Sequence, residues 1–188
     1  MISSVKLRAS ASKHDHTQGP EDAPLVLVEY GDYECSFCKR ADLIIKEIQK
    51  ALGDDLRYVY RNYPLVLRHP HAMDAARAAE SAALQDRFWE MHSMLFRNQE
   101  NLEHEDLVQY AKNVGLDGVR FTRDLESVKV EEKIALDLDS GARSGVEGAP
   151  TFFINGFRYD GDWSYESLLT VLMNVRADLA EEKMKKAG

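Results

Sequence analysis

The chain has 188 residues, 44% of them hydrophobic and 30% charged, and its formal net charge is −8. This length suits one domain, or one domain that carries an insertion, and it allows a sizeable core. The acidic balance argues against a general nucleic-acid binder, which needs a basic surface, and against adsorption to anionic membranes.

The first third of the chain predicts a strand, a helix and a second strand. Residues 1–24 are polar and indicate an extended arm, whereas the apolar run 25–30 predicts a strand buried on both faces. Apolar positions recur at helical spacing after Cys38, and Gly53 suits the C-terminal end of that helix. Residues 56–63 alternate in character and predict another strand. Two strands joined through a helix are expected to run parallel.

The rest of the chain has a different pattern. Residues 66–145 predict a block of helices, led by the Ala-rich stretch 71–85, with no strand pattern among them. The aromatic and methionine residues of 88–96 are interpreted as core. Residues 151–155 and 157–162 then predict a hairpin, and an amphipathic helix closes the sequence.

This order of elements predicts an α/β protein with one insertion. Residues 14–65 and 146–182 would form one small sheet with helices on both faces. Residues 66–145 would be an inserted all-helical domain, and residues 1–13 would be an N-terminal arm.

The chain contains two cysteines, Cys35 and Cys38, at the junction of the first predicted strand and its helix. A helix that begins near Cys35 would place this sulfur beside free backbone N–H groups, and the positive end of the helix dipole stabilises a thiolate. Thiols in such positions can have pKa values of roughly 3.5–7.5. Cys38 lies on the same helix face and can close a ring onto the first sulfur. The carboxylates of Asp32 and Glu34 would oppose a thiolate, while the two basic residues after Cys38 would favour it.

The spacing therefore favours a redox pair in which Cys35 attacks and Cys38 resolves, but two other interpretations stay open. A zinc site would need two further ligands, for which His69 and His71 offer a close pair. The two cysteines could also be ordinary core residues, because a single Cys-x-x-Cys is only a moderate signal.

Glu29 interrupts the first apolar run six residues before Cys35. A buried carboxyl is costly unless it is paired or neutral, and burial raises its pKa toward the range in which it can shuttle protons. We expect Glu29 to take the proton of Cys38, directly or through a water molecule. The alternative is an acid at the strand end that faces solvent.

Tyr33 and Phe37 flank the cysteines. Exposed aromatic side chains at a site usually bind something, so these two are expected to form an apolar rim for unfolded or peptide partners. The alternative is that they are half-buried cover. Pro150 stands at the mouth of the strand 151–155, where a proline is tolerated because no ladder hydrogen bond is needed.

Five stretches carry a resemblance to a known family. Over roughly residues 14–175 the chain closely resembles the DsbA-like thioredoxin-fold proteins, and the matching stretches are GPEDAPLVLVEYGDYECSFC, RNYPL, HPHAMDAARAAESAA, FWEMHSMLF and GVEGAPTFFING. The resemblance implies a thioredoxin fold split by a helical domain, and thiol–disulfide oxidoreductase activity without a metal or organic cofactor.

The resemblance also implies roles for single residues. Cys35 would be the nucleophile that forms the mixed disulfide, and Cys38 would resolve it. Pro150 would be a cis-proline facing the disulfide, and Ala149 would lend its backbone to a bound substrate. Glu29 falls where the family places its buried acid.

The implied partners are proteins or peptides with thiols or disulfides, with glutathione and a thioredoxin-type recycling protein as further candidates. The family often has Pro between its cysteines, and Ser36 and Phe37 stand there in this chain. Because this dipeptide tunes the redox potential, oxidase, reductase and isomerase directions all stay open. Ala149 is also smaller than the Val or Thr common before the proline.

Two alternative functions remain from the sequence. One is a non-catalytic thioredoxin-fold module that binds peptides beside Pro150, and the other is a relative of the DsbA-like glutathione transferases, which usually lack the second cysteine. Both cysteines being present favours the oxidoreductase.

Location is predicted from what the sequence lacks. No stretch approaches the roughly 20 apolar residues of a spanning helix, and the N-terminus has no apolar signal-peptide core. A cytoplasmic location is therefore expected, with a periplasmic or extracytoplasmic one as the alternative if a signal was removed. Many members of the family are exported, and similar domains are fused to membrane transporters.

Overall fold

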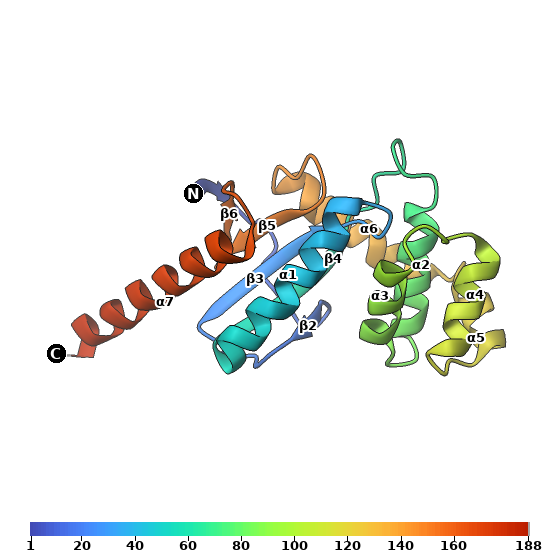
Figure 1. Cartoon of the computed structure of the whole chain (residues 1–188), viewed down its shortest axis with the longest axis horizontal. Coiled ribbons are helices and arrows are strands. Elements are labelled where there is room, and N and C mark those ends of the chain that lie inside the picture. The colour runs from blue at the N-terminus through green and yellow to red at the C-terminus, as the bar shows by residue number, and fades with distance from the viewer. Residues whose placement is uncertain (188) are drawn as a thin grey trace.

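A mixed sheet with helices on both faces forms the centre of the computed structural model, which describes residues 1–187 (Figure 1). The six strands follow the order β1-β6-β5-β3-β4-β2. The strands are β1 (Ile2–Lys6), β2 (His16–Gln18), β3 (Leu25–Gly31), β4 (Leu56–Asn62), β5 (Thr151–Ile154) and β6 (Phe157–Tyr159). The helices are α1 (Ser36–Leu52), the 3-10 turn η1 (Gly53–Asp55), α2 (Ala72–Ala83), α3 (Phe88–Arg97), α4 (His104–Asn113), α5 (Gly118–Asp124), α6 (Val128–Arg143) and α7 (Tyr165–Ala187).

The expected βαβ unit is confirmed. Strand β3 pairs in parallel with β4, from Leu25 opposite Leu56 to Gly31 opposite Asn62, and α1 connects the two strands. Helix α1 ends at Leu52, and its C-cap residue Gly53 has a positive φ of 52°, a backbone conformation that suits glycine.

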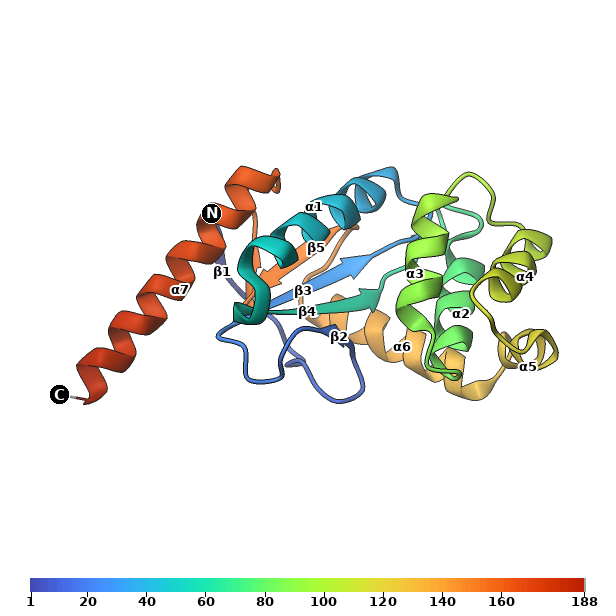
Figure 2. The same ribbon diagram turned by 60° about the horizontal axis from the view of Figure 1, so that its bottom comes forward.

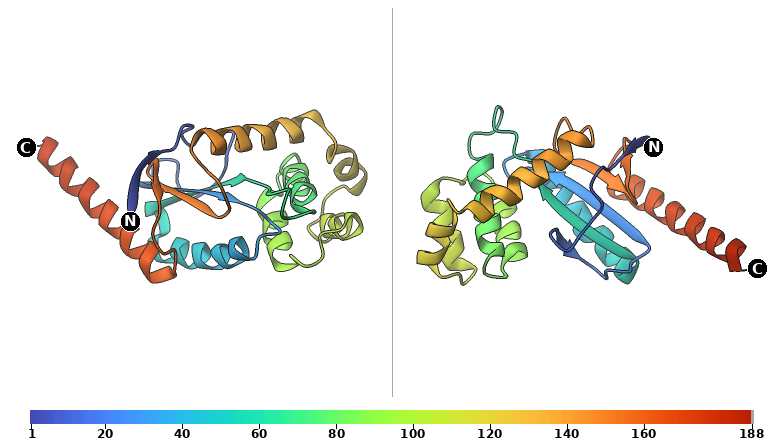
Figure 3. Two further views of the ribbon diagram at one scale, coloured as in Figure 1. Left: turned by 90° about the horizontal axis from the view of Figure 1, so that it is seen from above. Right: turned by 180° about the vertical axis from the view of Figure 1, so that it is seen from behind.

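The two faces of β3 pack against different helices because successive side chains alternate between them. Leu27 belongs to the core cluster that includes the buried face of α1, whereas Tyr30 belongs to the cluster on the other face and exchanges a hydrogen bond of 2.8 Å with Ser140 of α6. Figure 3 shows α1 and α6 on opposite sides of the sheet. Glu29, two residues after Leu27, is thereby directed toward α1.

The block of helices predicted for residues 66–145 is present and consists of α2 to α6. The predicted hairpin is β5 and β6, which pair antiparallel, and β5 joins the sheet antiparallel to β3. The closing helix is α7, whose C-terminal part projects away from the sheet (Figure 1). The α/β class with a helical block between two sheet-forming parts is therefore confirmed.

The polar N-terminal segment differs from the expected arm because it adds a strand to each edge of the sheet. Strand β1 pairs antiparallel with β6, with Ile2 opposite Tyr159, and β2 pairs antiparallel with β4, with His16 opposite Tyr60. Both strands are short and are held by backbone hydrogen bonds. Short edge strands of this kind lack the alternating apolar pattern by which strands are predicted.

The helical block shares its core with the sheet. Aromatic side chains of α3 pack against residues of the active-site turn and of β4, with the ring centroids of Phe96 and Tyr33 4.9 Å apart and those of His92 and Tyr60 4.7 Å apart. The aromatic stripe predicted as core is thus buried between the block and the sheet.

Gly141 on α6 gives a stability prediction. A Cβ atom there would lie 2.7 Å from the ring of Tyr63 and 3.1 Å from the ring of Tyr30. Gly141→Ala should therefore lower the free energy of unfolding by about 1–3 kcal/mol through overpacking, partly offset by about 1 kcal/mol of helix propensity. Urea unfolding measures the difference. Gly118→Ala, at the start of α5 with open space around its Cβ position, is the matched control and should lose nothing; equal stability of the two variants would contradict the close contact.

Candidate active site

The two cysteines lie where β3 leads into α1. Cys35 is the N-cap residue of α1, in extended conformation, and its backbone N–H donates to the carbonyl of Asp32 at 3.2 Å. Its side chain retains 5% exposure, whereas Cys38, one turn later, is fully buried. Both are free thiols. One sulfur therefore lies close to the surface at the helix N-terminus, with a small exposed fraction, while the other is fully enclosed beneath it.

The surroundings of Cys35 favour its thiolate. The Cys38 thiol donates a hydrogen bond to the Cys35 sulfur, and the backbone N–H groups of Cys38 and Phe37 do the same. Burial and the charge of Asp32 act in the opposite direction, but the net effect lowers the pKa of Cys35 to about 6. The N–H groups of the first helical turn thus stabilise the Cys35 thiolate, as the sequence predicted for a helix that begins near Cys35.

Cys38 has the opposite character. Burial is the main reason that its pKa lies well above the ordinary thiol value, and its hydrogen bond to Cys35 and the charge of Glu29 add to this. Its sulfur accepts the backbone N–H of Asp32 at 3.4 Å. Cys38 is therefore held protonated next to an ionisable partner.

Glu29 lies inside the protein, and the alternative of a solvent-facing acid is wrong. Its side chain is 1% exposed, and its Oε2 accepts a hydrogen bond from the Tyr58 hydroxyl at 2.8 Å. Its Oε1 is buried with no partner among the residues that the structure describes. Burial, above all, raises the pKa of Glu29 to about 8, and the charges of Asp42 and Cys35 raise it further against the effect of Tyr58. A carboxyl with such a pKa can gain and lose a proton near neutral pH.

The loop before β5 faces the sulfur of Cys35. The Cys35 thiol donates to the carbonyl oxygen of Ala149 at 3.3 Å, and the Ala149–Pro150 peptide bond is cis. The structure therefore brings Ala149 and Pro150, 114 residues after Cys35 in the chain, to the nucleophile.

The two aromatic residues predicted as a rim separate in the structure. Phe37 is 59% exposed on the first turn of α1 and is free to contact a partner. Tyr33 is only 1% exposed, so the expectation that it forms part of an exposed rim is wrong. Its ring turns inward beneath α3, where its hydroxyl meets Nδ1 of His92 at 3.1 Å.

Two polar residues beside the pair were not predicted to act together. Asp32 is buried, and its Oδ2 accepts the backbone N–H of Leu65 and Nδ1 of His69, both at 2.8 Å. The carboxylate therefore ties the loop after β4 to the active-site turn. A carboxylate directly after a buried strand was the available signal, but its partners lie more than 30 residues away.

The zinc interpretation finds no support in the part of the chain that the structure describes, where no group of three or more His, Cys, Asp or Glu side chains is arranged to hold a metal ion. His69 pairs with Asp32, and Nε2 of His71 lies 3.6 Å from a carboxylate oxygen of Glu103.

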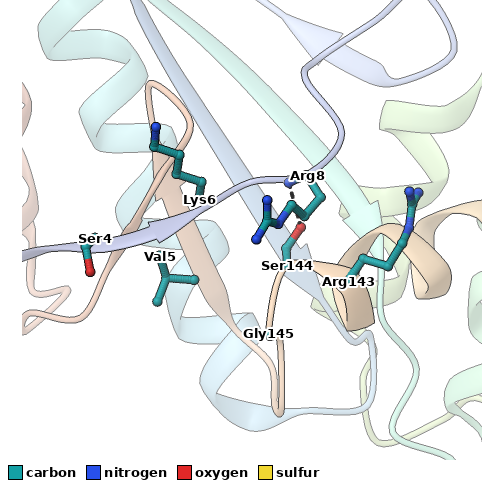
Figure 4. A pocket seen from close by; sticks show the side chains of 7 residues that line it. All are labelled: Ser4, Val5, Lys6, Arg8, Arg143, Ser144 and Gly145. Carbon is teal, nitrogen blue, oxygen red and sulfur yellow. Dashed lines mark hydrogen bonds between the residues drawn. The ribbon is translucent and has the colours of Figure 1, made fainter.

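A basic hollow of about 350 Å³ lies elsewhere, between β1 and the end of α6 (Figure 4). Lys6, Arg8 and Arg143 surround it, and the backbone N–H of Arg8 donates to the hydroxyl of Ser144 at 3.0 Å. None of the predicted site residues lines this hollow.

The chain is similar to a protein family, to curated proteins and to solved structures. A family described as thioredoxin matches residues 11–174. Among curated relatives, a Na⁺/H⁺ antiporter NhaA 1 from Mycolicibacterium vanbaalenii is 46% identical over 168 residues, which are 88% of this chain and 27% of the antiporter. The chain thus spans about a quarter of the length of such relatives.

Within the described residues, none of the helices has the length and apolar character needed to cross a membrane.

Two solved structures show the same fold. A thioredoxin-like oxidoreductase from Silicibacter pomeroyi is 25% identical, with a TM-score of 0.79 over 88% of this chain and 94% of that one. The thiol–disulfide exchange protein α-DsbA2 from Wolbachia pipientis is 20% identical, with a TM-score of 0.77 over 87% of this chain and 88% of that one.

Proposed function

Since the chain belongs to the thioredoxin family, we propose that it is a thiol–disulfide oxidoreductase that exchanges disulfides with protein or small-thiol substrates through Cys35 and Cys38. The observation that supports this most strongly is the contrast between the two thiols. Cys35 keeps a small exposed fraction and has a pKa of about 6, while Cys38 is fully buried and protonated within hydrogen-bonding reach of it. Two cysteines that only packed the core would not need different exposures and pKa values.

The proposed reaction runs in two exchange steps. The Cys35 thiolate attacks one sulfur of a substrate disulfide, forms a mixed disulfide with it, and releases the other substrate sulfur as a thiolate that takes a proton from water. Cys38 then loses its proton and attacks the Cys35 sulfur. This step forms the Cys35–Cys38 disulfide and releases the second substrate thiolate. Two electrons pass from the pair to the substrate, and the reverse sequence oxidises a dithiol.

Glu29 is the proposed acceptor of the Cys38 proton. It lies on the face of β3 that looks toward α1, its charge raises the pKa of Cys38, and its Oε1 has no partner among the described residues. A base with a pKa near 8 is suited to a thiol that must ionise only in the second step.

The substrate is proposed to bind across Ala149, Pro150 and Phe37. The Ala149 carbonyl already lies 3.3 Å from the Cys35 sulfur, so a backbone placed along this loop would bring its cysteine to the nucleophile. The exposed ring of Phe37 offers an apolar contact beside it. Proteins or peptides with thiols or disulfides, and glutathione, fit this surface. The ion antiport named for the relatives is not part of the proposal, because the chain matches about a quarter of their length.

Equilibration with glutathione tests the proposal. The protein is incubated in buffers of defined reduced and oxidised glutathione, and the free thiols are then read by the mass added on alkylation. We expect a two-electron transition from two alkylated cysteines to none. Since thiolate stabilisation favours the reduced form, the pair should be more oxidising than a dithiol of ordinary pKa. Persistence of two alkylated thiols in every buffer would overturn the proposed function.

A further inference from the structure

The helical block holds the turn that carries Cys35. Gln99 lies two residues beyond the end of α3, and Figure 2 shows α3 beside the segment that leads into α1. The Gln99 side-chain nitrogen donates to the carbonyl oxygen of Tyr33 at 2.6 Å and to that of Cys35 at 2.8 Å. A side-chain amide has two N–H donors, so both are used on this turn.

One of these carbonyls belongs to Cys35 itself, and the other lies two residues before it. The direction in which the Cys35 side chain leaves the turn depends on its φ of −79° and its ψ of 118°, and this ψ is far from the helical value. The Cys35 carbonyl also receives the first hydrogen bond of α1, from the N–H of Lys39 at 3.1 Å. Gln99 therefore holds the Cys35 carbonyl, whose orientation is tied to the ψ of Cys35, and the Tyr33–Glu34 peptide group just before it, and in this way constrains where the sulfur lies relative to the N–H groups of the helix start.

A second contact from α3 reaches the same turn. His92, 2% exposed, lies between the Tyr33 hydroxyl, 3.1 Å from its Nδ1, and the Asp42 carboxylate of α1, 3.3 Å from its Nε2. Burial lowers the pKa of His92, so its ring is neutral, with Nε2–H donating to Asp42 and Nδ1 accepting from Tyr33. Helix α3 thus holds the side chain of Tyr33 while Gln99 holds its backbone.

We propose that Gln99 is a positioning residue of the redox pair, which through the carbonyls of Tyr33 and Cys35 keeps the nucleophilic sulfur against the N-terminus of α1. The inserted helical block would then set the reactivity of a thiol that belongs to the sheet-forming part of the chain. This inference rests on the proposed function only for its consequence in disulfide exchange.

Removing the two donors gives the test. Gln99→Met keeps a side chain of similar length without N–H groups, so the turn can relax and the Cys35 thiolate loses part of its stabilisation. The rate of alkylation of Cys35 against pH, read by mass, reports its ionisation, because Cys38 is buried. We expect the midpoint to rise from near pH 6 by about one unit, and the equilibrium with glutathione to shift by about tenfold toward the disulfide.

The ionisable groups around the Cys35 sulfur are Cys38 of α1, Asp32 at the end of β3 and Glu29 within β3. None of them is changed in this variant. Gln109→Met is the matched control, because Gln109 lies on α4 and bonds only the exposed side chain of Asn113. It should leave the midpoint and the equilibrium unchanged.

Urea unfolding of the same proteins distinguishes a positioning role of Gln99 from a role in stability alone. Lower stability of Gln99→Met with an unchanged alkylation midpoint would overturn the inference. If this variant does not fold, Gln99→Ala is used instead. A raised alkylation midpoint of Cys35 would support the inference, and an unchanged midpoint would overturn it. Failure of the wild-type pair to equilibrate with glutathione would instead overturn the proposed function, while the alkylation midpoint would still decide the role of Gln99.

Discussion

Replacing Cys38 by alanine is expected to leave Cys35 joined to its substrate in a stable mixed disulfide. Cys38 is fully buried beneath Cys35, so its removal leaves the nucleophile in place, although the Cys35 thiolate loses the hydrogen bond that the Cys38 thiol donates. The first exchange step can proceed, but no second thiol is available to release the product. Turnover should fall on the order of 10³-fold or more, as for the loss of a group that acts as a unit with the nucleophile.

Incubation of Cys38→Ala with oxidised glutathione, followed by intact mass measurement, reveals the trapped species. We expect one glutathione per chain, carried on Cys35 and removed by dithiothreitol. Cys35→Ala is the matched control and should carry none, since the remaining thiol is buried and its pKa is raised. Equal capture by both variants, or by neither, would show that the roles assigned to the two sulfurs are wrong.

Glu29→Gln is expected to change both the exchange rate and the pH dependence of stability. In the second step the uncharged amide of the variant cannot take the proton of Cys38. General bases contribute roughly 10²–10⁴-fold, and at pH 7 only a minor fraction of Glu29 is ionised, so a loss of about 10–100-fold in the release of the mixed disulfide is expected. Stopped-flow measurement of glutathione release from Cys35 isolates this step.

The stability effect follows from the raised pKa. The ordinary value is 4.5 and the folded value is about 8, so between these pH values the folded state keeps a proton that the unfolded state has lost. Stability from this group is fully present below pH 4.5 and is lost as the pH rises toward 8. At about 1.4 kcal/mol for each unit of pKa difference, the loss is on the order of 5 kcal/mol at pH 9. Glu29→Gln should remove this slope in urea unfolding series.

Asp137→Asn separates the two effects of Glu29. Asp137 is a buried acid on α6 whose pKa is also raised, chiefly by burial, and it accepts the backbone N–H of Asn62. Its replacement should alter the pH dependence of stability in the same direction and leave glutathione release unchanged. A Glu29→Gln protein with wild-type release kinetics would remove Glu29 from the mechanism.

The elements that carry the site could be predicted because their patterns are local. The apolar run of β3 and the helical spacing after Cys38 place the cysteine pair at a helix start, and the structure has this start at Ser36. The resemblance to the DsbA-like proteins and the predicted fold class are confirmed by the family match and the structural neighbours.

What could not be predicted depends on contacts between distant residues. Tyr33 was expected at the surface because it flanks the cysteines, but its direction is decided by the packing of α3, 59 residues away at His92. The hydrogen bonds of Gln99 to the active-site turn span more than 60 residues, and no pattern along the chain marks such a pair. Edge strands β1 and β2 escaped prediction because their pairing uses backbone groups, which every residue has.

The core shared by the helical block and the sheet bears on how this chain came to be organised. Phe88 and Phe96 of α3 cover Tyr60 and Tyr33, so excising the block would strip the cover from aromatic rings beneath the active site. We infer that the boundary at residues 65 and 66 separates two kinds of secondary structure and does not separate two domains that fold independently. A different helical block could therefore replace this one only if its aromatic rings packed equally well against Tyr33 and Tyr60.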